Sequence, residues 1–187
     1  FALPMIDALE ELLRKIRPYE RINGSADAAF ERAMDQVIHG MMRSGVPGAK
    51  KGFRKAIEIM KEVEYDRSVP KPGVLIVGEY LLNFHPGANH DIEKYLEQNG
   101  FEIIEAKMTD VIRKTYFYQG SQIREYHLKK PLDKKAWFAI VDKVFNMAHD
   151  MTDEIALAHP LYEKACRMQD LVKESDPIIH HTFDAGE

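Results

Sequence analysis

The sequence is poor in cysteine and has no excess of positive charge, and each shortage excludes a class of site. Its 187 residues contain one cysteine, Cys166. One thiol cannot form an internal disulfide, and alone it cannot hold a structural zinc ion or an iron–sulfur cluster. The 26 basic and 30 acidic residues give a net charge of −4. Binding to nucleic acid is therefore disfavoured, because contacts to phosphate need a basic excess.

Long apolar runs are also missing. No stretch approaches the roughly 20 apolar residues that a membrane-spanning helix needs. Asp7, Glu10 and Glu11 interrupt the first residues, where a signal peptide would be continuously apolar. We therefore expect a cytoplasmic protein without a membrane partner, in agreement with its low cysteine content. The chain starts at Phe1 and ends at Glu187 without a polar tail, so we also expect it to be a piece of a longer protein.

What is present is a globular composition, 45% hydrophobic and 30% charged, with two kinds of periodicity. Residues 1–65 predict three amphipathic helices: one over 3–17, one after the turn at Asn23, Gly24 and Ser25, and one that begins beyond Gly48. Ser25 is the expected cap of the second helix. We predict a helical subdomain at 1–65, a linker at 66–73 and an α/β subdomain at 74–187 that is truncated at its C-terminus.

The α/β prediction depends on residues 74–106. Residues 74–77 form a short run rich in β-branched side chains, which is typical of a strand buried on both faces. A loop from 79 to 89, a short helix ended by Asn99 and Gly100, and a second strand at 101–106 follow. This order predicts a Rossmann-like βαβ unit with a short parallel sheet. The predicted fold class is therefore a helix-rich α/β protein, in which helices precede and follow the βαβ unit along the chain.

Further helices are expected after the second strand. Thr109 is the expected cap of a helix that carries Val111 and Ile112. The most strongly amphipathic stretch starts at residue 132 or 133 and has an apolar stripe that we expect to face inward: Trp137, Ile140, Val141, Val144, Phe145, Ala148, Met151 and Ile155. A last helix over 161–171 places Cys166 on its inward side. A third strand could open at Ile178 and Ile179.

The loop after the first strand is the candidate ligand site. Ligands of open α/β sheets bind beyond the carboxyl ends of the strands, and this loop offers a carboxylate, amides and imidazoles. The candidate ligand-binding residues are Gly78, Glu79, Asn83, His85 and Asn89. The plainer alternative is structural: Asn89 caps the next helix, Gly87 relaxes the turn, and Glu79 pairs with a surface cation. The loop lacks the GxGxxG pattern of a dinucleotide site.

Other motifs give weaker signals. His85 and His90, or His180 and His181 beside Asp184, match no known metal-ligand spacing, so we expect no metal site. The glycines at 45, 48 and 52 lie among basic residues and could cradle phosphate, but they follow a helix and lack the GK[ST] ending. The aromatic residues Tyr116, Phe117, Tyr118, Tyr126, Trp137 and Phe138 combine core positions with a patch that could meet a partner.

One segment is similar to a known family. The run KPGVLIVGEYLLNFHPGANHDIEKYLEQNGFEIIEAKMTDVI, Lys71 to Ile112, resembles part of the CoA-substrate-specific enzyme activases, which are related to the activator of 2-hydroxyacyl-CoA (2-hydroxyglutaryl-CoA) dehydratase. Gly78, Glu79, Asn83, Asn89 and Gly100 match the family's pattern. Shorter similarities lie at residues 16–20, 66–68 and 184–187.

The resemblance implies a context for this chain. In the family, an ATP-hydrolysing activator drives an electron toward a dehydratase-like region with [4Fe–4S] clusters, which removes water from a 2-hydroxyacyl-CoA. This sequence lacks the ATPase loops and the set of cysteines. It therefore resembles a fragment of the dehydratase-like region, for which ATP and [4Fe–4S] are cofactors of the parent protein, and no catalytic residue carries over.

We accordingly expect a fragment, inactive alone, that scaffolds or binds an acyl-CoA, a dehydratase subunit or the remaining domains of its parent chain. Glu79, Asn83 and Asn89 would supply the contacts. The first alternative is a non-catalytic interaction module that docks through its helices and aromatic residues. The second is a small stand-alone α/β enzyme that uses Glu79 and His85 as acid and base.

Overall fold

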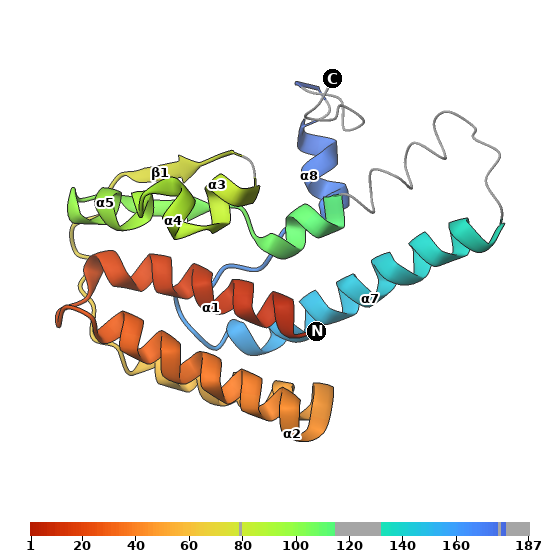
Figure 1. Ribbon diagram of the computed structural model, residues 1–187, viewed down its shortest axis with the longest axis horizontal. Helices are drawn as coiled ribbons and strands as arrows, with labels where there is room; N and C mark the ends of the chain where they lie inside the picture. The colour runs from red at the N-terminus through yellow and green to blue at the C-terminus, as the bar shows by residue number, and fades with distance from the viewer. Residues whose placement is uncertain (79, 115–131, 176, 179–187) are drawn as a thin grey trace.

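The computed structural model describes residues 1–78, 80–114, 132–175 and 177–178 (Figure 1). It confirms a helix-rich α/β fold in which a parallel βαβ unit lies between helical segments of the chain. A further helical segment at 108–114 follows the second strand. The named elements are α1 (Ala2–Ile16), η1 (Arg17–Tyr19), α2 (Ser25–Lys61), β1 (Gly73–Ile76), α3 (Tyr80–Phe84), α4 (Pro86–Asn89), α5 (Ile92–Gln98), β2 (Glu102–Glu105), α7 (Leu132–Ala156) and α8 (Met168–Ser175).

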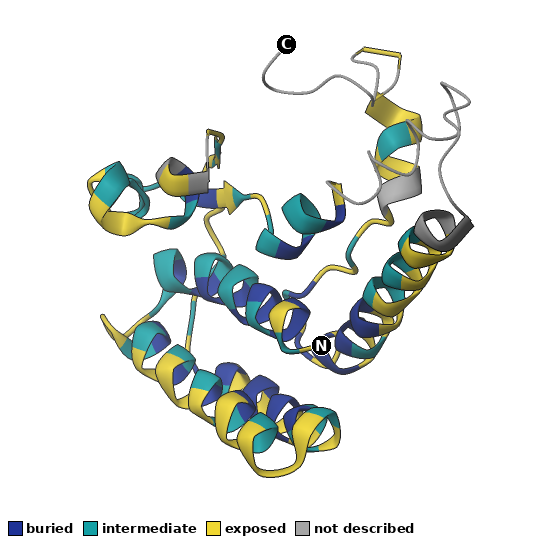
Figure 2. Ribbon diagram, turned by 45° about the vertical axis from the view of Figure 1, so that its right-hand side comes forward, coloured by how far each residue is buried: buried dark blue, intermediate teal, exposed yellow. Residues whose placement is uncertain are grey.

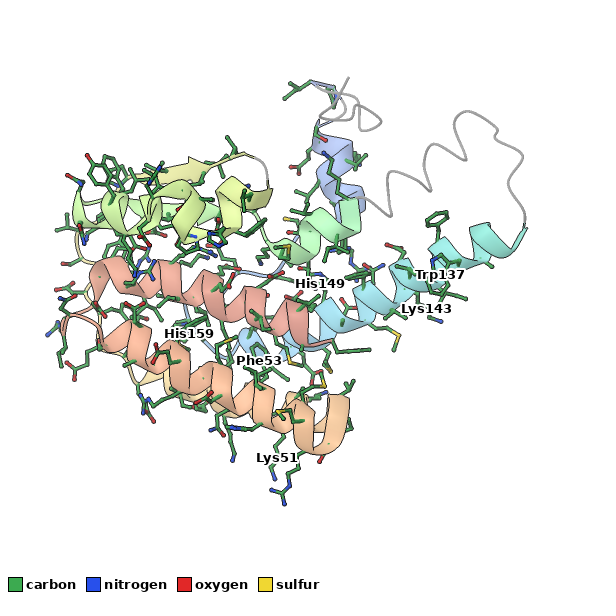
Figure 3. The ribbon with its side chains drawn as sticks, in the orientation of Figure 1. Lys51, Phe53, Trp137, Lys143, His149 and His159 are labelled. Atoms are coloured by element: carbon green, nitrogen blue, oxygen red, sulfur yellow. The ribbon has the colours of Figure 1, made fainter. Side chains whose placement is uncertain are left out.

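The hydrophobic core lies where α1 packs on α2 and on the end of α7. The apolar stripe of α1 is buried, and Phe53 of α2 is fully covered between the helices (Figures 2 and 3). Ile155 and Tyr162, from beyond the α/β unit in sequence, complete the same core. The domain boundaries at 65 and 74 remain a prediction, but packing joins the segments on either side of them. The core of α1 and α2 is therefore closed by a distant part of the chain.

The helix α2 is two antiparallel helices joined by a tight turn, as the sequence predicts from Gly45 to Gly48. Ser44 and Gly45 leave the helical conformation, and Gly45 has a φ of 62°, which favours glycine. The two halves then approach so closely that a Cβ atom on Gly48 would meet the backbone of Gly40, and one on Gly52 that of Gln36. The glycines at 48 and 52 therefore serve helix packing, which accounts for them without a phosphate cradle.

The cap of α2 differs from the prediction. Ser25 is the first helical residue, and its side chain does not cap the helix. The Glu20 carboxylate accepts hydrogen bonds from the backbone N–H groups of Gly24 and Ala26, both at 2.7 Å, and from the Ser25 hydroxyl at 3.2 Å. A negative charge at this position also interacts favourably with the helix dipole. The acidic residue that precedes the turn therefore stabilises the start of the helix.

The two described strands are parallel, with Val74 beside Ile103 and Ile76 beside Glu105. Gly100 has a φ of 89° and ends the crossover helix α5 as predicted. The prediction of a strand buried on both faces is wrong, because Leu75 is 60% exposed and Ile104 is 53% exposed. Only one face of this sheet is covered by other described elements. The predicted loop at 79–89 is also wrong for most of its length, since α3 and α4 are helical there.

The C-terminal predictions are partly wrong. The helix α7 forms as expected, but its first half projects from the body, and Trp137 points away from it (Figure 3). Trp137, Ile140 and Val144 are exposed, whereas Ala148 and Ile155 are buried. The apolar stripe thus faces the core only where α1 and α2 lie against it.

The last predicted helix is shorter than expected. Residues 161–167 are irregular, and α8 begins at Met168. Cys166 is exposed and does not behave as a small core residue. Ile178 lies in a turn, so it does not open a strand, while Ile179 and the residues Tyr116, Phe117, Tyr118 and Tyr126 lie outside the described residues.

The close approach in α2 gives a test of this core. We expect Gly52→Ala to lower the free energy of unfolding by about 1–3 kcal/mol, because the added methyl group would overlap the backbone at Gln36. At an unconstrained helix site the same change stabilises by about 0.5–1 kcal/mol. Urea unfolding measures the difference, with the exposed neighbour Lys51→Ala as control. A stabilised Gly52→Ala protein would contradict the packing.

Candidate functional site

The candidate site follows β1, at the carboxyl end of the strand. Gly78 lies in an exposed bend two residues after the end of the strand, and Glu79 lies outside the described residues. The chain then forms α3 and α4, which meet at His85. Asn83, His85 and Asn89 therefore lie on two consecutive short helices, at the edge of the sheet where open α/β folds bind ligands.

Asn83 is the buried polar residue of this region. The residue is 8% exposed, and its Oδ1 atom accepts no hydrogen bond from any described residue. A buried carbonyl oxygen without a donor is unfavourable by roughly 1–3 kcal/mol. Asn83 therefore holds an unused hydrogen-bond acceptor on α3, which a donor reaches only if the covering side chains move aside.

His85 has a structural role in the same region. Its Nδ1 atom accepts a hydrogen bond from the backbone N–H of Ala88 at 3.2 Å, so the His85 side chain caps α4. The alternative that Asn89 caps the next helix is wrong, because the N-cap of α5 is Asp91. Pro86 follows at the first helical position, which is favourable because proline has no N–H to leave unpaired. The capped nitrogen is committed to the backbone, so only the exposed Nε2 atom is available for other contacts.

Asn89 ends α4 and is half-buried. The next two residues, His90 and Asp91, have φ values of 57° and 53°, in the left-handed region that non-glycine residues adopt infrequently. This paired turn reverses the chain between α4 and α5. Among the sequence-predicted residues, Asn83, His85 and Asn89 are thus brought together by a single supersecondary unit, whereas Glu79 stays a prediction.

The metal predictions are tested only in part. Within the described ranges no three His, Cys, Asp or Glu side chains are grouped to hold a metal ion. His180, His181 and Asp184 lie outside those ranges. The expectation of no metal site in this chain therefore stays a prediction.

Sequence reasoning missed a second polar cluster, between the first half of α1, residues 107–113 and α7. The Asp7 carboxylate accepts the backbone N–H of Thr109 at 2.9 Å and also the Thr109 hydroxyl. Thr109 was the expected cap of the helix at 108–114, but the cap is Asp7, which lies on the distant α1. Apolar periodicity could not have shown this, because the partners are 102 residues apart.

The same cluster continues on α7. Arg113 donates to the Asn146 Oδ1 atom at 2.9 Å, and the Tyr162 hydroxyl donates to Asp153 at 2.7 Å. His149 is 7% exposed and lies in the second half of α7, near α1 (Figure 3). Burial is the main cause that lowers the pKa of His149 to about 4, and the positive charges of Arg113 and Lys107 contribute to the same shift. His149 is thus a neutral imidazole at physiological pH.

The cap at Thr109 leads to a stability prediction. We expect Asp7→Ala to reduce the free energy of unfolding by about 2 kcal/mol, since it leaves the buried N–H and hydroxyl of Thr109 without an acceptor. Asp7→Asn keeps an acceptor oxygen and should lose less than half of that amount. Chemical denaturation of the three proteins measures the order, and equal losses for both variants would contradict a capping role.

Comparison with known proteins gives no relative for this chain. Neither a protein-family model, nor a curated protein, nor a solved structure matches it. Among the helices that the structure describes, none combines the length and the apolar character needed to cross a bilayer. A proposal of function therefore depends on the geometry of the chain and on the resemblance expected from the sequence at residues 71–112.

Proposed function

We propose that the chain is part of an activase-related protein of the 2-hydroxyacyl-CoA dehydratase system, and that the segment after β1 binds an acyl-CoA or a partner subunit. The chain supplies a scaffold and hydrogen bonds. The parent protein supplies ATP hydrolysis and the [4Fe–4S] chemistry. With one exposed thiol, Cys166, this chain has too few soft ligands for a cluster of its own.

The observation that carries the proposal is the buried Asn83 Oδ1 atom, which accepts no hydrogen bond from a described residue at the carboxyl end of a parallel strand. The pantetheine arm of CoA carries amide N–H groups, which are donors for such an oxygen. Asn83 and Asn89 are also two of the residues at which the sequence resembles the activases. Geometry and resemblance thus both support Asn83, whereas Asn89 rests on the resemblance.

A non-catalytic interaction module is the second candidate, and a separate observation favours it. Leu75, Val77 and Ile104 expose apolar side chains on one face of the sheet, and Trp137, Ile140 and Met147 do so along α7. Exposed apolar groups of this kind occur at protein–protein contacts. A stand-alone enzyme that uses Glu79 and His85 is less well supported, because one ring nitrogen of His85 already accepts the N–H of Ala88.

Calorimetric titration with a 2-hydroxyacyl-CoA, 2-hydroxyglutaryl-CoA, tests the proposal directly. We expect the Asn83→Ala, Asn89→Ala double variant to bind about 10-fold more weakly than the natural chain, which is the effect of one to two lost hydrogen bonds. The matched control is Asn99→Ala, whose amide donates locally to the Tyr95 carbonyl at 2.7 Å on α5. The control should keep the natural affinity.

Three results would be decisive. A selective loss in the double variant supports the assigned site. Equal affinity in all three proteins would show that the acyl-CoA binds, but not at Asn83 and Asn89. An absence of binding to the natural chain overturns the acyl-CoA proposal and leaves the interaction module, provided that circular dichroism shows the chain to be folded.

A further inference from the structure

One side of α1 and η1 is charged, and this side faces the α/β unit. Arg17 of η1 holds the Glu97 carboxylate of α5 with two hydrogen bonds, from Nε at 2.6 Å and from Nη2 at 3.0 Å. Arg14 of α1 reaches Glu93 of α5 at 3.3 Å and forms an ion pair with Glu105 of β2. Two arginines thus connect the helix to both the crossover helix and the second strand.

Carboxylates outnumber the cations around Arg14 and Arg17, whereas elsewhere at the contact Arg67 pairs with Glu102 and Lys107 pairs with Glu11. Arg14 and Arg17 are paired with five acidic residues: Glu10, Asp27, Glu93, Glu97 and Glu105. The Glu105 side chain is fully buried, whereas Glu93 and Glu97 are only partly exposed. Five negative charges around two positive ones cannot all be neutralised, so the fully ionised cluster repels itself.

The contact therefore differs in kind from the core on the opposite side of α1. Burying ion pairs gives little net stability, because the loss of hydration offsets much of the attraction. Contacts between parts of a chain that are polar in this way permit relative motion. The unit is joined to the helices by residues 62–72 on one side and 106–107 on the other, and neither connector is a helix or a named strand.

We propose that the α/β unit, residues 73–105, docks reversibly on α1 and that docking takes up a proton in the carboxylate cluster around Arg14. The contact is then a proton-linked latch, which is closed when the cluster holds the proton and loosened when every carboxylate is ionised. The segment after β1 belongs to the moving unit, so the latch changes its position relative to α1 and α7.

Glu105 is the residue that holds the proton. Glu10 and Arg14 face it from α1 and Glu93 faces it from α5, while β1 places the uncharged Ile76 beside it. The pKa of Glu105 is raised to about 7, chiefly by burial; the charge of Arg14 lowers it, and the negative charges of Glu93 and Glu10 raise it. Burial raises the pKa of Glu10 and Glu97 as well.

The direction of the pH dependence follows from these shifts. An undocked Glu105 is exposed to water and has the ordinary pKa of 4.5, below its docked value. The docked state therefore binds the proton more tightly, and docking is favoured at low pH. This advantage is complete below pH 4.5 and disappears as the pH rises through about 7. Over that range the docking equilibrium constant should fall on the order of 100-fold.

A distance measurement between two spin labels tests the latch. In the full chain with Cys166→Ser, the labels replace the exposed residues Lys51 on α2 and Tyr95 on α5. We expect mainly a short-distance population near pH 4.5 and a longer-distance population that grows until about pH 7 and is constant above it, with the midpoint between these two values. Glu105→Gln should stay in the short-distance population throughout, because glutamine mimics the protonated acid.

The matched control is Glu58→Gln, an exposed glutamate that pairs with Lys61 on α2 and should keep the natural midpoint. A single unchanged population at every pH, or a natural midpoint in Glu105→Gln, overturns the latch. If the Glu105→Gln variant does not fold, the same distance measurement on the Glu93→Gln variant tests the proposal. Removing that charge should lower the midpoint, and an unchanged midpoint counts against the proposal.

Discussion

The two faces of α1 are the constraint on which the rest of the structure depends. One face is apolar and is buried against α2 and the end of α7, where burial of apolar surface supplies the stability. The other is charged: Asp7 accepts the N–H of Thr109, and Arg14 reaches β2. A single helix therefore holds the helical core and the α/β unit by two different interactions, which respond differently to salt and pH.

Much of this fold could be predicted from local patterns. The period of α1, the break at Gly45 and the left-handed Gly100 all depend on neighbouring residues, and each was confirmed. The caps supplied by Glu20 and Asp7 could not be assigned in this way, since they depend on which carboxylate reaches an N–H group. The prediction of which apolar residues are buried failed for a related reason. The apolar residues of β1 and α7 are buried only where another element covers them.

The candidate site shows the same division. The position after β1 could be predicted because a βαβ unit fixes where a strand-end segment lies. The separate roles of its residues could not be predicted. Asn83 is buried with an acceptor oxygen without a donor among the described residues, whereas His85 caps a four-residue helix. The charged residues of α1, which periodicity alone places on a solvated face, instead form the contact with the unit that carries this site.

Residue-resolved native-state hydrogen exchange at low and high salt is the most direct measurement of the central claim. If the α/β unit is held by the charged face of α1 and the core by its apolar face, then raising the salt concentration at about pH 5, where the cluster holds its proton and the ion pairs with Arg14 and Arg17 close the contact, should accelerate exchange at the β2 amides of Glu102 and Ile104. The Leu12 and Leu13 amides of α1 should keep their rates. Equal acceleration at both places, or no change at β2, would contradict two independent interactions.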